Sequence, residues 1–278
     1  MPFLTEPEPE RGDALAILDG VRRIVAANPG PMTYYGTNTY LIDTPAGLAV
    51  LDPGPADHPE HVDAIVRAAD GNVALILVSH HHHDHIGAIP ALQRATGAQT
   101  AGWREPATAE FEPDIKLDDG AEIAGLTAVH TPGHAPDHLC FLLPDRGGQD
   151  VLFSADHVMS WSSTVVSPPA GDMGAYFQSL ERLLARSDDV FLPGHGPPLS
   201  EPRTLVQELL HHRQQRERTI FSALESGRPA DTYTLMNAIY SQVHPTLRRA
   251  AERNVLAHLL KLEAEGMVAR EGGLWRAA

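Results

Sequence analysis

Four short apolar runs in this chain each end at a histidine or an aspartate, and this pattern constrains the fold more than any other feature. The first run, 74–78, leads into Ser-His-His-His-His-Asp-His at 79–85. Short apolar runs bounded by polar residues are typical of buried strands, so we expect these polar side chains to project from loops at strand ends. Imidazole and carboxylate without thiolate suit zinc, iron or manganese. The plausible ligands are His80, His82, Asp84, His85, His134, Asp156 and His195.

Composition indicates a soluble globular protein. The 278 residues are 42% hydrophobic, enough for one large core or for one core and a small appendage. The first ten residues lack the basic and apolar regions of a signal peptide, and no run reaches the roughly 20 apolar residues of a membrane span. We therefore expect a cytoplasmic protein without a membrane partner. The single cysteine, Cys140, excludes an internal disulfide and is expected to be a small buried hydrophobe.

Charge is unevenly distributed along the chain, whose formal net charge is −15. Residues 203–278 hold 11 of the 21 Lys and Arg residues but only 8 of the 36 acidic ones, so the excess of acids lies in the first 202 residues. Such a first part repels an extended polyanion outside a local basic path. This weighs against a nucleic acid as substrate.

The pattern of expected elements changes near residues 197–202. Before this point strands and helices alternate, whereas after it the periodicity is helical and ends in a short hairpin. We therefore expect a large first domain over 1–200 and a second over 203–278 that resembles a three-helix unit with a wing. The expected strands are 39–43, 48–52, 74–79, 98–102, 123–130, 138–143, 151–154, 190–192, 267–270 and 274–276. The expected helices are 58–69, 88–95, 173–185, 204–224, 232–243 and 247–265.

Spacing within the first motif favours metal binding. His80 and His82 lie two residues apart, and an extended backbone points alternate side chains to the same side. Asp84 follows where a turning chain would reach a second position, while His81 and His83 would point away. A solvated, partly charged loop is the alternative interpretation of four consecutive histidines. The position directly after a buried strand favours the metal site.

This first motif, His80-His81-His82-His83-Asp84-His85, resembles the His-x-His-x-Asp-His motif of the metallo-β-lactamase-fold hydrolases. The resemblance covers roughly residues 20–200 and implies an αββα sandwich with two metal ions, zinc by family inference and iron or manganese by ligand chemistry. It implies one ion on His80, His82 and His134, a second on Asp84, His85 and His195, and Asp156 bridging both. The later motifs occur in order as Thr131-Pro132-Gly133-His134, Phe153-Ser154-Ala155-Asp156 and Pro193-Gly194-His195-Gly196.

A second resemblance spans nearly the whole chain but is less specific. The segments 36–41, 212–218 and 251–263 are similar to the subgroup typified by the β-lactamase-like-protein-two endoribonucleases, with a winged-helix-like C-terminal domain. The chain departs from the common pattern at Ile86-Gly87-Ala88, where a Gly-Gly pair is usual. We expect this departure to affect packing only.

The implied mechanism uses hydroxide held between the two ions, because divalent cations lower the pKa of bound water from about 15.7 to roughly 7. Asp84 would also orient this hydroxide. His138 is the expected proton donor to the leaving group, with a strand-end hydrogen bond as the equal alternative, and Asp52 either orients a ligand histidine or caps a turn. His157 and His130 are expected to lie away from the metals. Solvated helix faces are expected for His58, His61, His211, His212, His244 and His258.

Three functions from different classes fit these observations. The leading hypothesis is a dinuclear zinc hydrolase that cleaves an ester-like bond of a small molecule, such as a thioester or a lactone. The second is a metal-dependent endoribonuclease on single-stranded RNA, motivated by the subgroup resemblance and the arginines of the tail. The third is a non-catalytic protein whose winged tail binds DNA and whose metal site only senses. A tail that packs on the first domain or pairs two copies into a homodimer would count against this third hypothesis.

Overall fold

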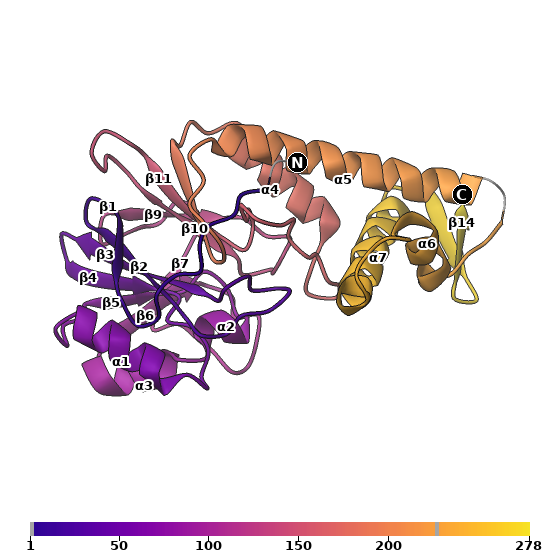
Figure 1. Ribbon diagram of the computed structural model, residues 1–278. Coiled ribbons are helices and arrows are strands. Elements are labelled where there is room, and N and C mark those ends of the chain that lie inside the picture. The colour runs from indigo at the N-terminus through magenta and orange to yellow at the C-terminus, as the bar shows by residue number, and fades with distance from the viewer. Residues whose placement is uncertain (1–2, 226–227) are drawn as a thin grey trace.

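Two β-sheets pack face to face and carry helices on their outer faces (Figure 1). The computed structural model describes residues 3–225 and 228–278. The first sheet has seven strands in sequence order, antiparallel from β1 to β4 and parallel from β4 to β7. Its strands are β1 (Leu15–Leu18), β2 (Val21–Val25), β3 (Asn38–Thr44), β4 (Gly47–Leu51), β5 (Leu75–Leu77), β6 (Gln99–Trp103) and β7 (Ile115–Leu117).

The second sheet has the strand order β12-β11-β10-β9-β8. Only the β11–β12 pair is parallel, because the helix α4 connects those two strands. The strands are β8 (Glu122–Ile123), β9 (Leu126–His130), β10 (Leu139–Leu143), β11 (Val151–Ala155) and β12 (Val190–Pro193).

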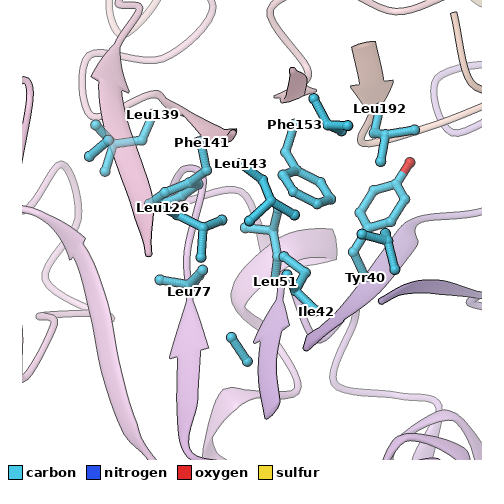
Figure 2. Packing of buried hydrophobic residues seen from close by; sticks show 14 of the residues in the cluster. Tyr40, Ile42, Leu51, Leu77, Leu126, Leu139, Phe141, Leu143, Phe153 and Leu192 are labelled. Carbon is cyan, nitrogen blue, oxygen red and sulfur yellow. The ribbon is translucent and has the colours of Figure 1, made fainter. Parts of the chain in front are cut away.

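Successive side chains of a strand point to opposite faces of its sheet. The apolar residues therefore form three layers, one between the two sheets and one on the outer face of each sheet. On β10, Phe141 packs into the core between the sheets, whereas its neighbour Cys140 faces the helices outside. On β3, Tyr40 and Ile42 face the same central core, and Leu41 faces the opposite layer. Figure 2 shows the central layer, with side chains from both sheets interdigitating. The predicted αββα sandwich is therefore confirmed.

Helices complete the two outer layers. The helices α1 (Pro59–Ala68) and α3 (Ile89–Thr96) cover the first sheet, and α4 (Met173–Leu184) covers the second together with the start of α5 (Pro202–Glu225). The short helix α2 (His83–Ile86) lies at the ends of the central strands, within the first histidine motif.

The C-terminal part has a separate apolar core. It contains α6 (Thr232–Ile239), α7 (Arg248–Ala264) and the hairpin of β13 (Val268–Glu271) and β14 (Leu274–Ala277), with a single 3₁₀ turn at Pro245–Leu247. The helix α5 is long enough to serve both parts: Leu205 and Leu209 pack on the second sheet, while Ile220 and Leu224 join the C-terminal core. None of the helices in the described ranges is long and apolar enough to cross a membrane.

The structure differs from the expected elements at several places. The expected strand 123–130 is two strands, because Ala124 and Gly125 both adopt positive φ and form a turn. The expected helix 232–243 ends at Ile239. Strands β1, β2 and β7 and helix α2 were not expected from the sequence pattern.

Candidate metal centre

Three histidine side chains from two loops converge above the ends of the central strands. His80 and His82 follow β5, and His134 follows β9. The Nε2 atom of His80 lies 2.9 Å from Nδ1 of His82, which lies 3.0 Å from Nε2 of His134. Three imidazole nitrogens at such mutual distances form a ligand set for one cation.

A second group lies beside the first and combines a carboxylate with two histidines. Asp84 and His85 lie on the single turn of α2, and His195 comes from the loop after β12. The Oδ2 atom of Asp84 is 3.3 Å from Nε2 of His195 and 3.8 Å from Nε2 of His85. These three residues form another set able to hold a cation.

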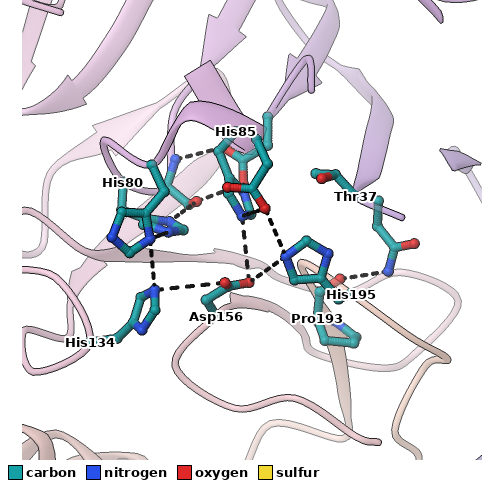
Figure 3. Close-up of polar contacts among 12 residues, drawn as sticks. Thr37, His80, His85, His134, Asp156, Pro193 and His195 are labelled. Atoms are coloured by element: carbon teal, nitrogen blue, oxygen red, sulfur yellow. Dashed lines mark hydrogen bonds and ion pairs between the residues drawn. The ribbon is translucent and has the colours of Figure 1, made fainter. Parts of the chain in front are cut away.

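Asp156 lies between the two groups, at the end of β11 (Figure 3). Its Oδ2 is 3.7 Å from Nε2 of His134, whereas its Oδ1 is 3.6 Å from Nε2 of His85 and 3.5 Å from Nε2 of His195. Buried polar atoms normally have hydrogen-bond partners, yet Oδ1 of Asp156 and Nε2 of His85 are buried without one. Ligand atoms that face a shared cation position have this geometry, so the residues fit a metal.

Hydrogen bonds on the outer side of the rings orient four of the histidines. The Nδ1 atoms of His134 and His195 contact the carbonyl oxygens of Val165 and Gly36 at 2.7 Å and 3.2 Å. Nδ1 of His80 contacts the hydroxyl of Ser79 at 2.9 Å. Such contacts fix the ring and aim the other nitrogen at a metal.

Asp52 orients the fourth ring, which settles the two interpretations of this residue in favour of orientation. Its Oδ2 lies 2.8 Å from Nδ1 of His85 and accepts the Ser79 hydroxyl at 2.6 Å, and its Oδ1 accepts the Ser79 backbone N–H at 2.8 Å. The residue is 1% exposed and has a φ of 53°. A positive φ is unusual for a side chain other than glycine, so packing and these three contacts hold the backbone in place.

The two groups differ in charge. Burial lowers the pKa of His80 well below its usual value and that of His82 to about 3, so the first group is neutral. In the second group burial also lowers the pKa, but neighbouring carboxylates outweigh it. Asp84, Asp156 and Asp52 hold the pKa of His85 well above its usual range, and Asp156 and Asp84 raise the pKa of His195 to about 9. A divalent cation bound there would replace these protons.

Two glycines make room for the ligand loops. A Cβ atom on Gly194 would lie 2.5 Å from Oδ1 of Asp156 and 2.9 Å from Cε1 of His85. A Cβ atom on Gly133, whose φ is 138°, would lie 2.4 Å from the Cα atom of Tyr176. Close backbone approach therefore explains the glycine that directly precedes each of the candidate ligands His134 and His195.

The remaining histidines of the first motif lie outside both groups. His83 is exposed and its Nε2 is 3.3 Å from a carboxylate oxygen of Glu110. His81 is partly buried, and its Nδ1 lies 2.7 Å from Oδ1 of Asp137. The sequence analysis did not anticipate this His81–Asp137 pair, because the two residues are 56 positions apart.

His138, the expected proton donor, is fully buried behind the first group. Its Nδ1 lies 2.9 Å from the hydroxyl of Thr131, and its ring centroid is 5.2 Å from that of His80. A donor to a leaving group has to reach the substrate side of the metals, and burial argues against that access. The role of His138 in catalysis stays a prediction.

Most other histidines lie where they were expected; His61, His258 and His212 do not, and His212 is half-buried with its Nδ1 atom covered. His130 stacks on Trp103 at 3.6 Å, and His157 packs against Tyr176. His61 and His258 were expected on solvated helix faces, but they are 4% and 0% exposed. The helical periodicity alone did not show that both helices carry these histidines on the face that packs inward.

Comparison with known families agrees with this geometry. Residues 32–195 match the model of the metallo-β-lactamase superfamily. The chain belongs to this superfamily. Within this metallo-β-lactamase superfamily member, residues 233–275 match the β-lactamase-associated winged helix domain, so the winged C-terminal domain is also confirmed.

The chain is similar over nearly its whole length to several curated relatives and solved structures. It is 31% identical to a β-lactamase-like protein 2 homolog of Drosophila melanogaster over 90% of each chain. It is 30% identical to an atrochrysone carboxyl ACP thioesterase of Aspergillus chevalieri, over 96% of this chain and 89% of the relative. A β-lactamase domain protein from Burkholderia ambifaria has the same fold, with a TM-score of 0.82 and 23% identity over 97% and 95% of the two chains. These similarities and the ligand geometry identify the protein as a hydrolase of this superfamily.

Proposed function

We propose that this protein is a dinuclear metal hydrolase that binds two zinc ions and cleaves an ester-like bond of a small molecule, such as a thioester or lactone. The position of Asp156 carries this proposal, because its two carboxylate oxygens face different ligand groups at 3.5 to 3.7 Å. The thioesterase among the relatives supports the substrate class. Iron or manganese would fit the same ligands.

The two groups of residues have different tasks in this reaction. Bound divalent ions would supply hydroxide at neutral pH and polarise the attacked carbonyl oxygen. Asp156 would hold both cation positions at a fixed separation. The side chain of Asp84 is 29% exposed, against 9% for Asp156. Asp84 contacts His85 and His195 through Oδ2. Its Oδ1 would accept a proton from the attacking water and so orient it.

The endoribonuclease hypothesis stays a prediction, and the arginines of the tail give it limited support. Arg213 is 1% exposed and therefore does not offer its charge to an extended phosphate backbone. Arg216 donates to the carbonyl of Ile239, and Arg253 donates to the hydroxyl of Ser167. The exposed arginines of the tail are Arg203, Arg218, Arg228, Arg249, Arg270 and Arg276, and these are the charges that an RNA backbone would have to contact.

The DNA-binding hypothesis and the homodimer also stay predictions. The winged-helix part of the structure is fixed to the first domain through α4, α5 and α7, and Ala257 of α7 lies in the core below the second sheet. Packing on the first domain thus accounts for part of this surface without a partner. The exposed side chains Tyr233 and Met267 belong to the remaining surface.

The proposal is tested by measuring bound metal and hydrolysis together. Zinc-loaded protein is assayed with an acyl N-acetylcysteamine thioester, a γ-lactone and a fluorescent single-stranded RNA at low and high salt. His82→Ala is expected to lose the first ion and at least 100-fold in thioester hydrolysis. His83→Ala is the matched control, because His83 lies in the same motif but points to Glu110. It is expected to keep both ions and its activity.

Other outcomes are equally informative. RNA cleavage that weakens with salt and disappears in His82→Ala, without thioester hydrolysis, would replace the leading function by the endoribonuclease. Equal metal content and activity in His82→Ala and His83→Ala would contradict the ligand assignment.

A further inference from the structure

A cavity of about 180 Å³ lies between the first domain and the winged helix domain. One wall is the segment that follows the bridging residue Asp156 and includes Met159 and Trp161. The opposite wall comes from the ends of α6 and α7 with the residues between them, including Val243. Nothing in the reaction described above assigns a role to this cavity.

The wall of the cavity is in direct contact with the ligand loops. Val165 lines the cavity, and its carbonyl oxygen lies 2.7 Å from Nδ1 of the ligand His134. Trp161 lines it too and packs on Gly196, the neighbour of the ligand His195: a Cβ atom at Gly196 would lie 2.5 Å from Cδ1 of the indole. The cavity wall is therefore one residue removed from the candidate ligands His134 and His195, and the remaining part of a substrate held at the metals is the group that we expect the cavity to receive.

Most of the lining is apolar and able to adapt. Met32 and Met159 contribute flexible thioethers, and Val243 and Leu247 contribute branched side chains. The indole of Trp161 is supported from behind by Tyr34, with ring centroids 5.1 Å apart. A flat apolar group would find a rigid aromatic surface on one side and adjustable side chains on the other.

One charged side chain, Arg213, lies at the floor of the cavity. It is 1% exposed, and each contact that it makes within the described residues is to a neutral group. Its guanidinium donates to the carbonyl oxygen of Thr164 and, at 3.2 Å, to Oδ1 of Asn254, and it lies 5.5 Å from the ring centroid of Tyr176. A buried charge without an opposite charge is costly, so this position favours a negative group nearby.

The surroundings do not offset the positive charge of Arg213. None of the described residues that line the cavity is an aspartate or a glutamate, although the chain as a whole carries a net charge of −15. Burial and the guanidinium groups of Arg213 and Arg216 lower the pKa of the neighbouring His212 to about 4. The cavity is thus locally positive, although the protein as a whole is acidic.

We propose that this cavity binds the non-reacting end of the substrate and selects an apolar group that carries a carboxylate. The inference rests on the proposed hydrolase function, because it makes the cavity a part of the same substrate site. The apolar walls bind the body of the group, and the charge of Arg213 discriminates between an anion and its neutral isostere.

Binding to metal-free protein tests the inference without any turnover. The probes are 2-naphthoate and 2-naphthamide, which differ in charge but hardly in shape, and the readout is titration calorimetry. Naphthoate is expected to bind at least fivefold more tightly than naphthamide to the unmodified protein. Val243→Trp is expected to abolish binding of both probes, and Ser241→Trp, an exposed position two residues away, to leave it unchanged.

Arg213→Gln then separates charge from shape. It is expected to remove the preference for naphthoate and to keep naphthamide binding; if this variant does not fold, the unmodified protein and the two tryptophan variants still decide. Equal affinities for the probes, binding that survives Val243→Trp, or no binding at all would each overturn the inference. Because no metal or hydrolysis is involved, a failure here is distinguishable from a failure of the thioester assay.

Discussion

At the scale of single residues, Asp52 is the carboxylate that links the two groups of candidate ligands. It contacts His85 and both polar groups of Ser79, and Ser79 in turn contacts His80. One side chain therefore orients a histidine of each group. Removal of such a hydrogen-bond partner of a ligand typically weakens metal binding roughly 10- to 100-fold.

Asp52→Asn is expected to weaken binding of the second zinc ion by roughly 10- to 100-fold, because the amide no longer attracts the proton on Nδ1 of His85. The first ion should bind with little change. Titration with a competing chelator measures both affinities. Asp63→Asn, an exposed aspartate on α1, is the control, and equal zinc affinities in the two variants would remove the orienting role.

His61 provides a prediction for acid stability. Burial lowers its pKa to about 4 in the folded protein, below the unfolded value near 6.5. The fold therefore favours the neutral ring: this contribution is complete above pH 6.5 and is lost as the pH falls towards 4. His61→Gln should reduce the loss of unfolding free energy between pH 7.5 and pH 4.5 by about 2 to 3 kcal/mol, measured by urea unfolding of metal-free protein. An unchanged pH dependence would contradict it.

Residue spacing predicted the seven candidate ligands because their motifs are local. Asp52 was assigned to two alternatives, since its partner His85 is 33 residues away and Pro53-Gly54 beside it is equally typical of a turn. The pair of His81 and Asp137 was missed for the same reason. Contacts through space leave no trace in the spacing of a single sequence.

At the scale of elements, the candidate ligands lie at strand ends, on loops and on the single turn of α2, where backbone approaches backbone closely. The loop after β12 is the tightest case, because Asn38 donates to the carbonyl oxygens of Pro193 and Gly196 at 2.9 Å and Tyr40 donates to that of Pro193 at 2.8 Å. Strand β3 thereby holds the loop that carries His195. Little space remains there for a larger residue.

Gly194→Ala is expected to reduce bound metal to one ion or none while the protein stays folded, because the new methyl group would displace Asp156 from between the ligand groups. Metal analysis and circular dichroism measure the two effects. Gly102→Ala is the matched control, since a Cβ there would meet its neighbours at an ordinary 3.5 Å. Two bound ions in Gly194→Ala would contradict this prediction, because the loop would then have moved to accommodate the methyl group.

The periodicity of the sequence predicted most helices and strands of the sandwich. For each element that it missed, the structure shows a physical reason. Strand β2 was missed because Arg22 and Arg23 interrupt its apolar pattern. Arg23 is nevertheless buried, and its charge is paired with Glu6 at 2.8 Å. Strand β7 has three residues and lies at the sheet edge. Helix α2 is a single turn inside a motif that was interpreted by its chemistry.

At the scale of the whole molecule, one helix serves two cores. The division into 1–200 and 203–278 stays a prediction; Pro197, Pro198 and Pro202, which indicated a break there, lie at or just before the start of α5. Proline is also favourable in the first turn of a helix. The proline-rich segment is therefore a helix start, and α5 then runs through both parts.

Truncation tests the dependence of the first domain on α5. A chain ending at residue 201 loses Leu205, Val206 and Leu209 from the layer below the second sheet and is expected to lose cooperative thermal unfolding. A chain ending at residue 225 keeps them and should unfold cooperatively, with a lower midpoint. Circular dichroism measures both, and equal behaviour of the two chains would show that α5 is dispensable for the first core.

The shared helix also limits how a gene for such a protein can recombine. A crossover near residue 203 would join a winged helix domain to a sandwich that lacks the apolar stripe of Leu205 and Leu209. A crossover after residue 225 would keep the sandwich but separate Arg213 from Asn254 of α7. With the cavity around Arg213 as the proposed pocket for the non-reacting end of the substrate, exchange of the C-terminal domain alone would change which substrates the hydrolase accepts and leave the candidate metal ligands in place.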